Sequence, residues 1–317
     1  MGSFILATNV VLPIFLILVL GKYLKKIKIV DEHSINIMNK ITFRVFMGIL
    51  MFVNIYNIRN SRIELEGNFK YLFFPAVIVF IVYFLVWLIY LKPIKNKKEF
   101  AVMVQGVYRG NFALFGLPVA ESIYGQEGAS RVAMLLAIVI PIYNILAVLT
   151  LEYYSDSGKK TEIKKLLKAI LKNPLIIGVL SATVVLKLNI VLPKAIYKTL
   201  YDLSKIATPL SFVILGASLE FGNMLKNFKK LISVNIFKLI INPMVTLAFG
   251  YILKFSGVEM VALLAMSACP TAVSSFSMAK EMNVAGDLAG EIVASTTVLS
   301  IFTMFLWIVL LKNLGII

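Results

Sequence analysis

Apolar residues in this chain come in long runs, separated by short clusters of Lys, Asn, Gly and Pro. The runs are about 20 residues long, which is the length an α-helix needs to cross the hydrocarbon core of a bilayer. The pattern predicts an all-α integral membrane protein with ten transmembrane helices. The expected spans are residues 4–21, 35–56, 71–91, 100–124, 130–151, 168–188, 195–219, 231–253, 259–282 and 288–312.

Two of these spans, the fourth and the ninth, are interrupted near the middle by Gly or Pro. The fourth reads YRGNFALFGLPVAESIYG over residues 108–125, and the ninth reads SACPTAVSSFSMAKEMNV over residues 267–284. In lipid, an interrupted helix leaves backbone groups unsatisfied unless the interruption lines a cavity or is buried in protein. Paired interruptions at matching places in two halves are typical of transporters that bind their substrate there.

The two halves of the chain also align with each other. Residues 26–46 correspond to residues 187–207, and each half contains five of the expected spans. Because five is an odd number, the second copy must enter the membrane from the opposite side. We therefore expect a 5+5 inverted repeat, made of residues 1–152 and 166–317 and joined by a cytoplasmic linker at 153–165.

The net charge of +16 would fit a nucleic-acid-binding protein, but the basic residues lie in short loops between the spans. Loops that follow odd-numbered spans carry 18 Lys and Arg residues, and the opposite loops carry 9. Positive residues accumulate on the cytoplasmic side of membrane proteins. We expect a multi-pass protein of the cell membrane with both termini outside and no nucleic-acid partner.

The residues that intramembrane enzymes need are not assembled in this sequence. A prenyltransferase would need clustered Asp residues for Mg²⁺, and an intramembrane protease would need an Asp dyad, a Ser and His pair or a zinc site. The chain has one His and one Cys, and its acidic residues near the spans are scattered. We expect no enzyme activity and no bound metal, and a membrane sensor or scaffold stays an alternative to a transporter.

Both interrupted segments resemble those of the auxin efflux carrier family, which includes the plant PIN proteins and bacterial malate-permease-like carriers. The matching residues are Asn111, Gly116, Pro118, Tyr124 and Gly125 in the first segment and Pro270, Ala279, Lys280, Glu281, Asn283 and Val284 in the second. Plant members have Pro where this chain has Gly110 and Gln where it has Thr271. These differences bring the chain closer to the bacterial members.

The resemblance implies a fold like that of the bile-acid symporters and transport by an elevator-type mechanism. It implies a small organic anion as substrate, such as malate or an auxin-like acid, and a homodimer formed by a scaffold of the first, second, sixth and seventh spans. Coupling to H⁺ or Na⁺ stays open, as does the alternative of a Na⁺-coupled bile-acid-type symporter. No other cofactor is expected.

A carboxylate that crosses the membrane loses its water, so a binding site must replace that water with donors. The half-helices that begin after the two interruptions offer free N–H groups. The candidate substrate-binding residues are Gly110, Asn111, Pro270, Thr271, Ser274, Ser275 and Arg109, with Gly116 and Pro118 as helix-breaking residues. The alternative is that the small residues only allow close helix packing, and that Arg109 snorkels or pairs structurally.

Four further charged residues have open roles. Glu121 and Glu281 end the interrupted spans and are candidates for coupling, although they could be solvated helix ends. Arg44 and Lys205 occupy one position of the repeat inside their spans, where cations are costly. Lys205 could instead pair with Asp202, three residues before it.

Overall fold

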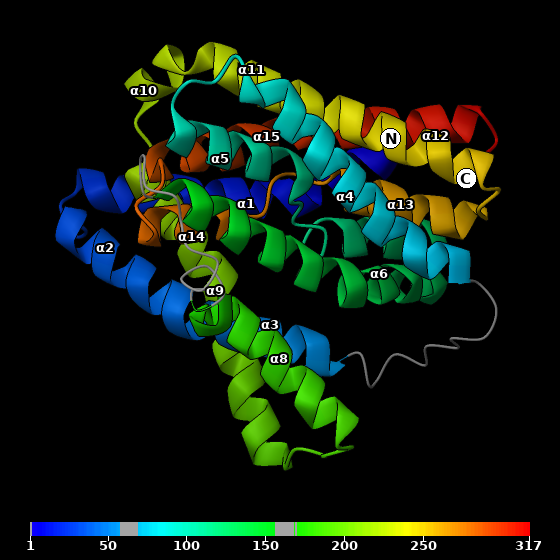
Figure 1. Ribbon diagram of the computed structural model, residues 1–317, viewed down its shortest axis with the longest axis horizontal. Coiled ribbons are helices and arrows are strands. Elements are labelled where there is room, and N and C mark those ends of the chain that lie inside the picture. The colour runs from blue at the N-terminus through cyan, green and yellow to red at the C-terminus, as the bar shows by residue number, and fades with distance from the viewer. Residues whose placement is uncertain (1, 58–68, 156–167, 169) are drawn as a thin grey trace.

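A computed structural model describes residues 2–57, 69–155, 168 and 170–317, and every regular element in these residues is a helix (Figure 1). Most of the expected linker at 153–165 lies outside the described residues. The elements are α1 (Gly2–Lys26), α2 (Glu32–Ile41), the π-helical turn η1 (Thr42–Phe46), α3 (Met47–Tyr56), α4 (Phe69–Leu91), α5 (Lys97–Tyr108), α6 (Gly116–Ser155), α8 (Pro174–Lys187), α9 (Lys194–Ser218), α10 (Phe221–Lys226), α11 (Phe228–Ile236), the π-helical turn η3 (Phe237–Ile241), α12 (Asn242–Ile252), α13 (Gly257–Ala268), α14 (Val273–Glu281) and α15 (Gly286–Asn313).

Six helices among the described residues are long and apolar enough to cross a membrane. They are Glu32–Tyr56, Phe73–Leu91, Gly116–Ser155, Lys194–Ser218, Phe228–Ile252 and Gly286–Asn313. Two shorter helices, α8 and α13, are also apolar. The protein is therefore an integral, multi-pass membrane protein, as the apolar runs predict.

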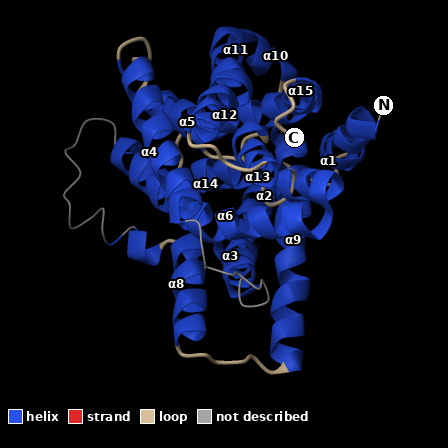
Figure 2. Cartoon of the chain, turned by 90° about the vertical axis from the view of Figure 1, so that its right-hand side faces the viewer, coloured by secondary structure: helices blue, strands red, loops and turns tan. Residues whose placement is uncertain are grey.

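One group of helices, formed by α1, α2, α3, α8 and α9, is called the projecting group here. Figures 1 and 2 show α8 and α9 extending together beyond the rest of the molecule, and α3 packs against both. Glycines allow the backbones in this group to approach closely, because a Cβ on Gly216 of α9 would overlap the Leu18 carbonyl of α1, and one on Gly178 of α8 would overlap the Gly48 carbonyl of α3.

The second group, formed by α4, α5, α6 and α11 to α15, is called the central group. Its helix α6 bends sharply at Tyr124 and Gly125, where Gly125 has φ 58° and ψ −143°. This backbone conformation is close to a region that only glycine adopts readily. After the bend, Gly128 lies against the carbonyl of Ala120, so the two arms of α6 fold back closely on each other.

Asp202 on α9 forms a different ion pair from the one that the sequence suggests. Asp202 pairs with Lys198 at 2.6 Å rather than with Lys205, whose ammonium lies 4.1 Å from the centre of the Tyr201 ring. Residues three and four apart both lie on the same face of a helix, so either pair is compatible with α9, and the side chains adopt the Lys198 pair. Lys205 is exposed on the surface of α9 rather than buried inside the protein.

Candidate functional site

The two non-helical segments, 109–115 and 269–272, cross each other as a short antiparallel pair. The amide of Asn111 donates to the carbonyl of Pro270 at 2.9 Å, and the amide of Ala272 donates to the carbonyl of Arg109 at 3.3 Å. Gly110 and Thr271 form a β-bridge between these two bonds. Some of the backbone groups released by the missing helical turns are therefore satisfied across the crossing.

The residue types at the crossing explain why the chain takes this conformation. Pro270 has no N–H and cannot continue the hydrogen bonding of α13. Only glycine fits at position 110. A Cβ there would stand 2.5 Å from the Cys269 sulfur and 3.1 Å from both Lys238 Nζ and the Met266 carbonyl oxygen. The absence of a side chain at Gly110 lets the two segments touch.

Thr271 holds the crossing in place. Its hydroxyl donates to the carbonyl of Gly106 at 2.6 Å, and its amide donates to the hydroxyl of Thr296 at 3.2 Å. The residue is 1% exposed. Because the Thr271 hydroxyl proton is already donated to α5, this side chain ties α5 to the second segment.

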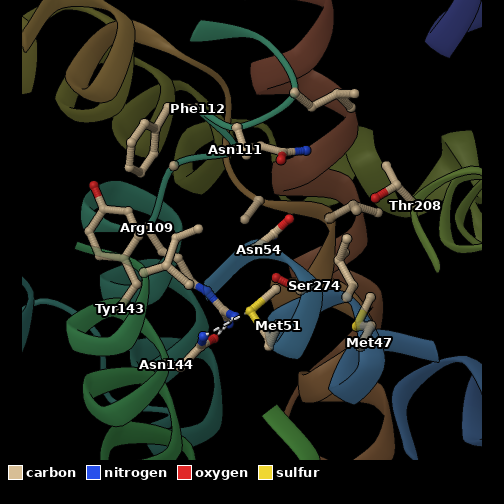
Figure 3. Close-up of a pocket in the computed structure, with 17 residues that line it drawn as sticks. Met47, Met51, Asn54, Arg109, Asn111, Phe112, Tyr143, Asn144, Thr208 and Ser274 are labelled. Atoms are coloured by element: carbon tan, nitrogen blue, oxygen red, sulfur yellow. Dashed lines mark hydrogen bonds between the residues drawn. The ribbon is translucent and has the colours of Figure 1, made fainter. Parts of the chain in front are cut away.

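A cavity of about 220 Å³ lies beside the crossing, between the projecting and the central groups (Figure 3). The projecting group contributes Met47, Leu50, Met51, Asn54 and Thr208. The central group contributes Arg109, Gly110, Asn111, Phe112, Ala113, Leu114, Ile140, Tyr143, Asn144, Ala272, Val273 and Ser274. Any relative movement of the two groups would therefore reshape this cavity.

Arg109 brings a positive charge to the cavity wall. The residue is 2% exposed, and its guanidinium donates to Asn144 Oδ1 at 2.6 Å, a contact drawn in Figure 3. The same guanidinium lies 3.8 Å from the sulfur of Met278. Among the described residues, Arg109 forms no ion pair with a carboxylate. A buried cation without a counter-charge is costly, so the cavity is electrostatically suited to an anion.

Further donors face the same space. The Nδ2 atom of Asn111 is buried and has no hydrogen-bond partner. Ala272, Val273 and Ser274 form the start of α14, and residues 111–115 form a hydrogen-bonded turn that leads into α6. The first amides of a helix have no preceding turn to accept their hydrogens and carry the positive end of the helix dipole. The cavity thus combines a guanidinium, an amide donor and two helix starts.

The structure brings together some of the predicted site residues and separates others. Arg109, Gly110, Asn111 and Ser274 line the cavity, whereas Pro270, Thr271 and Ser275 are buried beside it. Ser275 Oγ has no partner among the described residues.

The remaining predicted residues lie at helix ends. Gly116 and Pro118, expected at the interruption, lie instead in the first turn of α6, where proline is tolerated. Glu121 is exposed on α6. Glu281 ends α14 and pairs with Arg44 Nε at 2.7 Å, which joins the central group to the projecting group.

Several polar residues at the site are not among those that the sequence predicts. Asn54, Asn144 and Thr208 line the cavity, and Lys238 lies fully buried behind the crossing. The available signal was a polar residue inside an apolar run, which in a membrane span indicates function by default. Lys238 in NIFKLII and Asn144 in IPIYNIL both have that signal.

Comparison with known proteins finds similarity over almost the whole chain. Residues 6–308 match the family model described as membrane transport protein. An uncharacterized transporter of Methanocaldococcus jannaschii is 28% identical over 96% of this chain and 99% of its own length. An uncharacterized transporter of Methanothermobacter thermautotrophicus is 25% identical over 98% of this chain and 99% of its own length.

Proposed function

Because this chain belongs to the membrane transport protein family, the family of the auxin efflux carriers, we propose that it is a secondary transporter of a small carboxylate. The observation that carries the proposal is Arg109, a buried cation on the cavity wall with no carboxylate partner among the described residues. A guanidinium binds a carboxylate through paired charge-assisted hydrogen bonds. The substrate therefore supplies the missing negative charge.

The cavity favours a small anion over a large amphipathic one. Its volume of about 220 Å³ is below the roughly 300–1,000 Å³ typical of sites for drug-sized ligands. Polar groups from Arg109, Asn111, Ser274 and Asn144 converge on it. A mono- or dicarboxylate of the size of malate suits this combination better than a bile acid, and the relatives' names agree with a transporter.

The arrangement supports an inverted repeat of ten crossings that works as an elevator. The interruptions at 109–115 and 269–272 fall at corresponding places of the halves 1–152 and 166–317. The cavity lies between the projecting group, which contains the spans proposed here as the scaffold, and the central group. Sliding of the central group would carry the crossing and its anion between the two faces of the membrane. The scaffold would also form a homodimer interface.

The direct test is uptake by purified protein in proteoliposomes. Labelled mono- and dicarboxylates are offered under separately imposed pH and Na⁺ gradients, with protein-free liposomes as the control. We expect accumulation of at least one small carboxylate. Carboxylate binding without uptake would favour a sensor instead, and a response to bile acids alone would favour the bile-acid-type symporter.

Replacing Asn111 by alanine should weaken carboxylate binding by about 1 to 3 kcal/mol, because a buried charged partner loses one hydrogen bond. Substrate-induced thermal stabilisation of the purified protein measures this change. The matched control is Asn235→Ala, since Asn235 is also buried but donates to Leu231 and Ser295 away from the cavity. Equal substrate-induced shifts in wild type and Asn111→Ala would place the site elsewhere.

Single cysteines should report the proposed orientation, in which both termini are outside. Lys95 lies in a loop and Lys194 begins α9, and both are exposed; the proposal puts them on opposite sides of the membrane. The native Cys269 is buried and should not react. In intact cells, an impermeant maleimide should label Lys194→Cys and should reach Lys95→Cys only after permeabilisation. The opposite labelling pattern would reverse the orientation.

A further inference from the structure

Lys238 is a second buried cation at the crossing, on the side away from the cavity. It is 0% exposed and lies in the π-helical turn η3, and its ammonium donates to the carbonyl of Ser267 at 3.3 Å. Its Nζ is close to Gly110, where a Cβ would stand 3.1 Å from it. Among the described residues, no carboxylate forms an ion pair with Lys238.

The surroundings of Lys238 are the carboxyl-terminal ends of two half-helices. Helix α5 ends at Tyr108 and helix α13 ends at Ala268. Asn242 Nδ2, on the helix that follows η3, lies 3.5 Å from both the Val107 carbonyl of α5 and the Ser267 carbonyl of α13. The last carbonyls of a helix lack partners and carry the negative end of its dipole. Two negative helix ends therefore meet beside one ammonium group.

The crossing is thus divided into two electrically different sides. The starts of α14 and of the turn into α6 face the cavity with Arg109, and the ends of α5 and α13 face Lys238 and Asn242. In transporters built from inverted repeats, half-helix ends and unwound carbonyls of this kind coordinate the coupling Na⁺. Here a lysine side chain lies at such carbonyls.

We propose that the Lys238 ammonium is a tethered cation that takes the place of a bound metal cation at the crossing, so that anion transport needs no Na⁺. The inference rests on the proposed function, because it concerns how the same site is kept neutral. A free Na⁺ beside the buried ammonium would be repelled by it in a low-dielectric environment. The lysine also cannot diffuse away, so the two negative helix ends stay compensated through the whole cycle.

The first test needs only the wild-type protein in proteoliposomes. Carboxylate uptake is compared in Na⁺ and in N-methyl-D-glucamine, a cation too large for the crossing. We expect rates within about twofold of each other. A tenfold or greater loss without Na⁺ would overturn the inference while leaving the proposed function intact. If no carboxylate is bound or transported in either medium, the proposed function itself fails.

The second test removes the ammonium group of Lys238. Lys238→Ala should lower carboxylate uptake in N-methyl-D-glucamine at least tenfold, and millimolar methylammonium or Na⁺ should restore at least a third of the lost rate by entering the vacated space. Lys238→Met, which fills that space, should lose uptake without such rescue. The control is Lys205→Ala, because Lys205 is exposed on α9 and does not line the cavity.

Two outcomes of the second test would contradict the inference. Full uptake by Lys238→Ala without Na⁺ would mean that the positive charge is not needed. A folded Lys238→Ala protein, with the melting temperature of wild type, that no small cation restores would mean that the side chain only packs. Where Lys238→Ala does not fold, the wild-type comparison and Lys238→Met decide the matter.

Discussion

Replacing Arg109 by glutamine is expected to weaken carboxylate binding by at least about 2 kcal/mol, or about 30-fold. The guanidinium is buried at the cavity wall and donates to Asn144 at 2.6 Å. Glutamine can still donate to Asn144 but carries no charge, so the bound anion would be left buried without its counter-charge. Isothermal titration of the purified protein with the transported carboxylate measures the loss.

Two further variants isolate the role of the charge. Arg109→Lys keeps the charge but not the paired geometry, so its affinity should lie between those of wild type and Arg109→Gln. Lys205→Gln removes one cation from an exposed position over the Tyr201 ring and should leave affinity unchanged. If Arg109→Gln binds as tightly as wild type, Arg109 is not part of the binding site.

Replacing Gly110 by alanine should lower the free energy of unfolding by about 1 to 3 kcal/mol, the usual cost of overpacking, and should abolish carboxylate uptake. The new Cβ would stand 2.5 Å from the Cys269 sulfur and 3.1 Å from the Met266 carbonyl oxygen. Neither of the two crossing segments can move away without breaking the backbone hydrogen bonds between them. Thermal unfolding in detergent, combined with uptake in proteoliposomes, measures both effects.

A glycine outside the crossing provides the matched control. Gly222 lies in α10, and a Cβ there would have no atom within 4 Å. Gly222→Ala should therefore be neutral or slightly stabilising, because alanine loses less entropy in a helix. The double variant Gly110→Ala/Cys269→Ala should recover part of the lost stability. An unfolding temperature like that of wild type for Gly110→Ala, or a double variant that recovers no stability, would contradict the tight crossing.

Part of the candidate site could be predicted from residue types at single positions. Gly110 and Asn111 fall in the non-helical segment 109–115, and Pro270 and Thr271 fall in 269–272. Gly110 and Pro270 could be found because a glycine or proline acts on its own backbone, and Asn111 and Thr271 directly follow them in the sequence. The same reasoning predicts a break at Gly116 and Pro118, but the first turn of a helix accepts both, and they lie in α6.

Other features of the site depend on contacts that no local pattern contains. Thr271 was expected to face the substrate, but its hydroxyl donates to Gly106, 165 residues away in the sequence. Arg44 pairs with Glu281, 237 residues away. Lys238 appears in the sequence only as one cation in an apolar run. Which carbonyl or carboxylate each side chain meets is decided by how the two helix groups pack.

The sequence by itself determined that this is a multi-pass membrane protein of a transporter family, because run length, hydropathy and motif order are properties of the chain alone. It also indicated where the helices would be interrupted. Only the tertiary structure decided which side chains face the cavity and which cation lies on which side of the crossing. Those outcomes depend on the rotation of each helix about its axis and on its neighbours, since a side chain's partner is set by packing in space rather than by its position in the sequence.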